Sequence, residues 1–149
     1  MLSVLREIFY NEPLISAFTG WLGAQGVKVI TKIVSERRFD FKWFVLTGGI
    51  ISSHTAGVIA LATSCAIKFG LGSGYFALAS ALAALIIFDA RIIRKAAGKQ
   101  AEALNKIVED LYRKKKLEMI GLRELLGHTS VEVFIGAIFG LLIGVLLTY

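Results

Sequence analysis

Residues 131–149 read VEVFIGAIFGLLIGVLLTY, and this stretch decides the fold class. It is almost wholly apolar and close to the roughly 20 residues that a helix needs to cross a bilayer, so it predicts a membrane-spanning helix. The whole chain of 149 residues agrees, with 56% hydrophobic and 19% charged residues and a mean hydropathy of +0.69. A soluble domain of this size could not hide so much apolar surface, because a small globule keeps much of its area in water.

Three further apolar stretches precede this one, at residues 13–34, 43–69 and 75–90. The second stretch is interrupted at Gly48-Gly49 and resumes at Ser52. A turn-like run at residues 70–74 separates it from the third. We therefore expect an all-α integral membrane bundle of about four transmembrane helices, forming a single domain over residues 1–149.

The segment between the last two stretches, residues 91–127, is polar. From Ala97 onward its apolar residues fall on one stripe at helical spacing, which predicts an amphipathic helix. Three pairs of opposite charge at i,i+4 support this helix: Glu102 with Lys106, Glu109 with Arg113, and Asp110 with Lys114. The basic run that follows would face water or anionic headgroups.

The basic residues are distributed unevenly along the chain. Ten lie in residues 91–127 and three in residues 35–42, whereas Arg6 and Lys68 lie near the opposite ends of the apolar stretches. Because cytoplasmic loops carry an excess of Lys and Arg, we expect a multi-pass protein with its basic linkers on the cytoplasmic side and both termini outside. Membrane orientation thus accounts for the net charge of +6, and no nucleic-acid partner is expected.

Polar residues gather at one membrane depth near this cytoplasmic side. Lys28 and Lys32 lie one helical turn apart near the end of the first stretch, and Gln25 lies one turn earlier. A charged group at mid-helix costs about 2.5–3.5 kcal/mol and usually marks function. The two histidines, His54 and His128, each stand where an irregular segment enters an apolar helix. Helix N-termini with basic residues nearby favour an anion such as phosphate.

Each of these features also has a simpler explanation, which the sequence leaves open. The lysines could snorkel to the headgroups. Glu132 fits a capping box with Thr129, and Asp89 could pair with Arg91 or Arg94. A stripe of small residues near the C-terminus could serve close helix packing or a homodimer: Gly136, Gly140 and Gly144.

Five short motifs follow one another along nearly the whole chain: Asn11-x-x-Leu14, Ala24-Gln25-x-x-Lys28, Gly48-Gly49-x-x-Ser52-Ser53-His54-x-Ala56, Asp89-Ala90-x-x-x-Arg94-Lys95-x-x-Gly98-x-Gln100-Ala101-x-x-Leu104-Asn105, and Leu126-Gly127-His128-Thr129-x-x-Glu132-Val133. Together they resemble the divergent branch of the type 2 phosphatidic acid phosphatases, a family related to vanadium haloperoxidases.

The resemblance implies hydrolysis of a lipid phosphate or diphosphate through a phosphohistidine. By this analogy His128 attacks phosphorus, Glu132 orients it and His54 protonates the leaving group, with no cofactor and no metal. The expected phosphate-binding residues are hydroxyl and basic side chains: Lys28, Lys32, Ser52, Ser53, Arg94 and Lys95. The expected supporting residues are Gln25, Asp89, Gln100 and Asn105. The expected partner is a membrane lipid that carries a phosphate.

Two alternatives remain open. Ile51 and Ser53 stand where the wider family has proline and glycine, which favours a non-catalytic protein that binds anionic lipid or a phosphorylated ligand. The other alternative is a small transporter or channel component, although the outer halves of the apolar stretches hold almost no polar residue.

Overall fold

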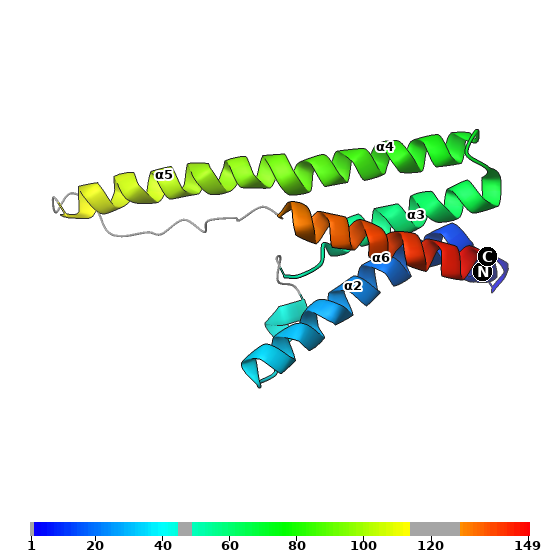
Figure 1. Cartoon of the computed structure of the whole chain (residues 1–149), viewed down its shortest axis with the longest axis horizontal. Helices are drawn as coiled ribbons and strands as arrows, with labels where there is room; N and C mark the ends of the chain where they lie inside the picture. The colour runs from blue at the N-terminus through cyan, green and yellow to red at the C-terminus, as the bar shows by residue number, and fades with distance from the viewer. Residues whose placement is uncertain (1, 45–48, 114–128) are drawn as a thin grey trace.

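The computed structural model describes residues 2–44, 49–113 and 129–149. Within these ranges the chain is helical and forms no strand, which confirms the all-α class. Figure 1 shows the elements in chain order: α1 (Leu2–Phe9), α2 (Glu12–Glu36), the 3-10 helix η1 (Phe41–Phe44), α3 (Ser53–Phe69), α4 (Gly74–Phe88), the π-helical turn η2 (Asp89–Ile93), α5 (Arg94–Arg113) and α6 (Ser130–Thr148).

Capping side chains determine where the four helices of the bundle begin. Asn11, Ser52, Ser73 and Thr129 precede α2, α3, α4 and α6, and each side-chain oxygen accepts a hydrogen bond from a backbone N–H of the first turn. Such a cap satisfies one of the N–H groups that the helix itself cannot pair. The helix bounds therefore lie close to the predicted apolar stretches. In the second stretch, the described helix is confined to the part that follows Ser52.

Helix α3 is the centre of the bundle, because it packs against α2, α4 and α6 (Figure 1). The interior holds small residues, among them Ala24, Ala56 and Ala60, each fully buried. Large apolar side chains point outward instead, and both Leu78 and Leu146 are 74% exposed. Small residues inside and large residues outside are typical of helices that pack closely within a lipid bilayer.

The closest approach in the bundle is between α6 and α3. Gly136, Gly140 and Gly144 are all buried on the face of α6 that meets α3. A Cβ atom on Gly136 would lie 2.6 Å from the carbonyl oxygen of Ser52, and one on Gly140 would collide with the carbonyl oxygen of Ala56. The glycine stripe therefore serves helix packing within the chain. A homodimer through the same stripe stays a prediction, and this face of α6 is already occupied.

Helix α4 continues through η2 into α5, which extends away from the other helices (Figure 1). The amphipathic helix predicted from Ala97 onward is thus present as α5, with Leu104 and Ile107 exposed on it. By length and apolar composition, α6 is the one helix in the described ranges that could cross a membrane alone, and α4 is apolar but shorter.

The close contact at the glycines predicts that glycine-to-alanine substitutions at two positions will differ in their effect on stability. Gly140→Ala should lower the free energy of unfolding by about 1–3 kcal/mol, because the methyl group would force α6 away from α3. Gly26→Ala in α2 is the control, since a Cβ there has no atom within 4 Å. It should be neutral or stabilising by up to about 1 kcal/mol, because alanine favours helix. Denaturant unfolding in detergent measures both, and equal stabilities would contradict the packing described.

Candidate functional site

Lys28 places a buried amine beside the start of α3. Its side chain is 5% exposed, and Nζ donates hydrogen bonds to Ser53 Oγ at 3.0 Å and to Gln25 Oε1 at 3.5 Å. Both of these acceptors are uncharged groups of the bundle interior. The side chain thus turns into the bundle and does not snorkel outward along α2. A buried cation costs free energy, and in membrane proteins such a residue is commonly functional.

The first turn of α3 gathers hydroxyl groups around this amine. Ser52, Ser53 and Thr55 are 0%, 1% and 0% exposed. Ser52 Oγ accepts from the Thr55 backbone N–H at 3.4 Å and from the Thr55 hydroxyl at 2.9 Å. The N-terminus of a helix has unpaired N–H groups and a positive dipole end, both of which favour an anion. The lysine, the hydroxyls and the helix start together form a group of donors suited to phosphate oxygens.

A backbone hydrogen bond joins the starts of α3 and α6. The Ser52 N–H donates to the carbonyl oxygen of Glu132 at 3.0 Å. His54 lies in the first turn of α3, where its side chain is exposed, unlike those of Ser53 and Thr55. His128 precedes the N-cap of α6 in the sequence and lies outside the described residues. The structure thus brings together the two helix starts to which the sequence assigned the histidines.

Glu132 completes a capping box at the start of α6. Its Oε2 accepts from the Thr129 backbone N–H at 3.3 Å, and its own N–H donates to Thr129 Oγ1 at 3.2 Å. The simpler explanation given for this residue in the sequence, a helix cap, is therefore confirmed. That Glu132 also orients His128 stays a prediction.

Three residues outside the expected set of site residues help to build the site. Gln25 Nε2 donates to the backbone carbonyl of Trp43 at 3.3 Å, and Trp43 is 5% exposed. Ile51 is 2% exposed in an apolar cluster with Ala24 and Ala56. The third is Thr55, whose hydroxyl bonds Ser52. Tryptophan is frequent at membrane interfaces, and this preference was a signal for Trp43. Ile51 was noted only because the wider family has proline at its position, and no local pattern indicated that it would be buried in this cluster.

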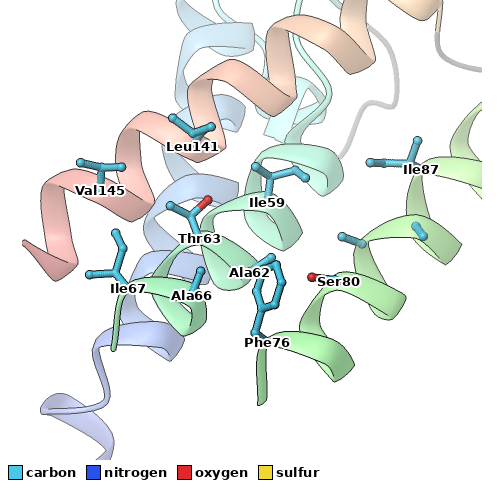
Figure 2. Close-up of a pocket in the computed structure, with 12 residues that line it drawn as sticks. Ile59, Ala62, Thr63, Ala66, Ile67, Phe76, Ser80, Ile87, Leu141 and Val145 are labelled. Atoms are coloured by element: carbon cyan, nitrogen blue, oxygen red, sulfur yellow. The ribbon is translucent and has the colours of Figure 1, made fainter. Parts of the chain in front are cut away.

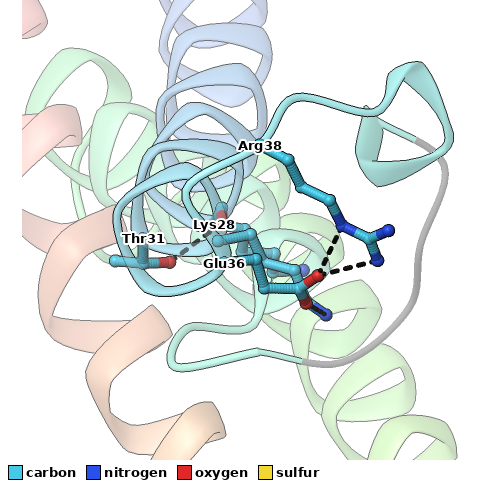
Figure 3. Close-up of polar contacts among 5 residues, drawn as sticks. Lys28, Thr31, Glu36 and Arg38 are labelled. Atoms are coloured by element: carbon cyan, nitrogen blue, oxygen red, sulfur yellow. Dashed lines mark hydrogen bonds and ion pairs between the residues drawn. The ribbon is translucent and has the colours of Figure 1, made fainter.

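The C-terminal end of α2 holds a separate cluster of charged residues. Lys32 Nζ pairs with Glu36 at 3.2 Å and lies 5.9 Å from the centroid of the Trp43 ring. Arg38 pairs with the same carboxylate at 3.0 Å, as Figure 3 shows. The hydrogen bond from Arg38, and then that from Lys32, lower the pKa of Glu36. The structure therefore directs Lys32 toward Glu36, whereas Lys28 faces Ser53.

The remaining expected residues lie along η2 and α5. Asp89 begins η2, and Gln100 and Asn105 follow on α5 at about 16 Å and about 24 Å from it along the helix. The structure does not join these two amides to the Ser53 cluster. Arg94 and Lys95 begin α5, and their side chains lie outside what the structure describes. In the described part of the chain, no three His, Cys, Asp or Glu residues form a group that could hold a metal.

These features define a helical membrane protein with a polar, basic cluster at the joined ends of its helices. The chain belongs to the Divergent PAP2 family, whose sequence model matches residues 9–143. It is also 37% identical to a Bacillus subtilis (strain 168) protein described as the uncharacterized membrane protein YuiD, over 96% of this chain and 98% of that protein. No solved structure matches the chain significantly. The resemblance inferred from the five motifs is thereby confirmed.

If the buried amine binds anions, its removal should weaken the binding of a phosphate analogue. Lys28→Met keeps the length of the side chain and removes its charge, and we expect at least about tenfold weaker binding of orthovanadate. Lys68→Met is the matched control, because Lys68 pairs with Glu12 at 3.0 Å near the far end of α3. Calorimetric titration in detergent measures both variants. Unchanged affinity in Lys28→Met would remove this lysine from the site.

The charged cluster at the end of α2 predicts a pH effect on stability. Folding lowers the pKa of Glu36 from its ordinary value of 4.5. The contribution of Glu36 to folding stability is therefore full above that value and is lost as the pH falls through the lower pKa of the folded state. The wild type should therefore melt above Glu36→Gln at neutral pH, with the difference vanishing in acid and shrinking in high salt. Melting curves across pH test this, and a difference that grows in acid would contradict it.

Proposed function

We propose that this protein is a membrane phosphatase that hydrolyses a lipid phosphate or diphosphate at the cytoplasmic leaflet. One observation carries the proposal: the buried amine of Lys28 lies 3.0 Å from Ser53 Oγ, at the capped start of α3 and next in sequence to His54. A phosphate placed there would meet the ammonium group, serine hydroxyls and the N–H groups of the first turn. Membership of the Divergent PAP2 family supports the same chemistry.

The proposed reaction divides between two histidines. A neutral imidazole of His128 forms a bond to phosphorus while the bond from phosphorus to the lipid oxygen breaks, and His54 gives that oxygen its proton. Water then attacks the phosphohistidine, which releases inorganic phosphate and restores His128. The hydrogen bond between Ser52 and Glu132 supports this division, because it holds the starts of the two helices side by side.

We further propose that α2, α3, α4 and α6 all cross the membrane. Contacts hold the ends of α2 and α3 in register, with Glu12 against Lys68 at one end and Lys28 against Ser53 at the other. The 16 helical steps from Glu12 to Lys28 cover about 24 Å, close to the roughly 30 Å of a hydrocarbon core. The exposed large apolar side chains suit lipid as their surroundings. The basic linkers would then be cytoplasmic and both termini outside.

A second candidate is a protein that binds a phosphorylated lipid without hydrolysing it. Two observations favour it. The Glu132 carboxylate already accepts the Thr129 N–H in the capping box, and Ile51, where the wider family has proline, is packed in the apolar core. This candidate predicts saturable binding of the lipid with no release of phosphate.

Release of inorganic phosphate by the purified protein distinguishes the two candidates. We expect release from at least one lipid phosphate or diphosphate, with or without a chelator. His128→Ala should abolish it, and His54→Ala should lower kcat by about 10²–10⁴-fold. Lys68→Met, remote from the site, should retain the rate of the wild type. Folded protein that binds these lipids but releases no phosphate would establish the non-catalytic alternative.

A further inference from the structure

A groove opens between α3, α4 and α6 (Figure 2). Its lining on α3 begins at Ile59, beyond the polar cluster at the start of this helix. The volume of the groove is about 610 Å³, within the roughly 300–1,000 Å³ of pockets that hold small ligands. Of the described residues that line it, only Thr63 and Ser80 are polar and none is charged. The groove therefore suits an uncharged, apolar occupant.

The groove lies on the same helices as the polar cluster. Along α3 the lining begins at Ile59, about 9 Å from Ser53, and ends at Ile67, about 12 Å further. Leu141 and Val145 of α6 line the same groove. The start of α6 lies beside Ser52, because the Ser52 N–H donates to the Glu132 carbonyl. One molecule with an anionic head and an extended apolar tail would match both regions at once.

Within a bilayer, the occupant that best suits this groove is a hydrocarbon chain. An apolar surface in lipid gains little from hydrophobic transfer, but an unfilled groove loses the dispersion contacts of its lining. A flexible hydrocarbon chain restores these contacts without burying polar groups. Phe76 lies at the far end of the groove and packs against the cluster of Ala62, Cys65 and Ala79.

We propose that this groove binds the hydrocarbon chain of the lipid whose phosphate is bound at the start of α3. The proposal rests on the proposed function for the site of the headgroup, and it adds the substrate class: a lipid phosphate with at least one long chain. Recognition then has two parts, with charge and hydroxyl groups selecting the phosphate and the groove selecting the chain.

The first test locates the chain directly. Phosphatidic acid with a diazirine at the end of one acyl chain is photolysed with the protein in phosphatidylcholine nanodiscs, and the labelled peptides are identified by mass spectrometry. We expect label on the groove-lining segments of α3, α4 and α6, several-fold stronger than with the matched diacylglycerol, which lacks the phosphate. Equal labelling by both probes, or label concentrated elsewhere or on a second copy of the chain, would overturn the proposal.

The second test fills the groove. Ala84 lines it and is exposed, so Ala84→Phe should place a ring there without disturbing the core. Ala81→Phe makes the same change on the same helix at an exposed position outside the lining. For Ala84→Phe we expect kcat/KM for dipalmitoyl phosphatidic acid to fall about tenfold, as if two methylene contacts were lost, with dioctanoyl phosphatidic acid nearly unaffected. Ala81→Phe should alter neither.

The two tests separate the groove from the phosphatase. Groove labelling that depends on the phosphate, in a protein that releases no phosphate from any lipid, would overturn the phosphatase and retain the lipid site. Phosphate release that is equally fast from both chain lengths in Ala84→Phe, with dispersed labelling, would overturn the groove and retain the phosphatase.

Discussion

The structure depends on how closely the backbone of α6 approaches the backbone of α3. This approach is possible because positions 136, 140 and 144 carry no Cβ atom, so carbonyl groups of α3 lie where side chains would otherwise be. Only at this separation can the Ser52 N–H reach the Glu132 carbonyl. That contact creates the polar cluster, because it brings the capped starts of α3 and α6 side by side. Lys28 of α2 then adds its amine through the hydrogen bond to Ser53.

The placement of small side chains inside and large ones outside determines how the helices hold together. Alanine, glycine and serine predominate in the interior, so the helices are held largely by close backbone contacts and by few large side chains, Ile51 and Trp43 among them. Helix α4 packs mainly on α3, and so the surface between α4 and α6 is left open. Where α4 and α6 diverge, the open surface is lined mainly by apolar side chains.

The sequence predicted the helical class, the limits of the long helices and the pairing of polar residues with helix starts, because apolar length and capping residues are local signals. It did not separate Lys28 from Lys32, since one helical turn places both on one face while only Lys28 reaches Ser53. It expected Gln100 to support the site, which stays a prediction, and no local signal showed that α5 continues from α4 and extends away from the other helices (Figure 1). Small residues at every fourth position indicate that a helix makes a close contact, but they do not show which helix is the partner. The groove could not be predicted either, because it depends on the relative placement of three helices.

The inward lysine has a consequence for how the chain is inserted during synthesis. Helix α2 carries Gln25 and Lys28 on its buried face, and it does not pass the test of length and apolar composition that α6 passes. A charge at mid-helix costs about 2.5–3.5 kcal/mol in lipid, and the hydrogen bond from Lys28 to Ser53 offsets part of this cost once α3 is beside α2. Helix α2 is thus a poor independent insertion unit. If α2 and α3 both cross the membrane, as proposed above, we expect them to leave the translocon together as a helical hairpin, with the site assembled on entry into the bilayer.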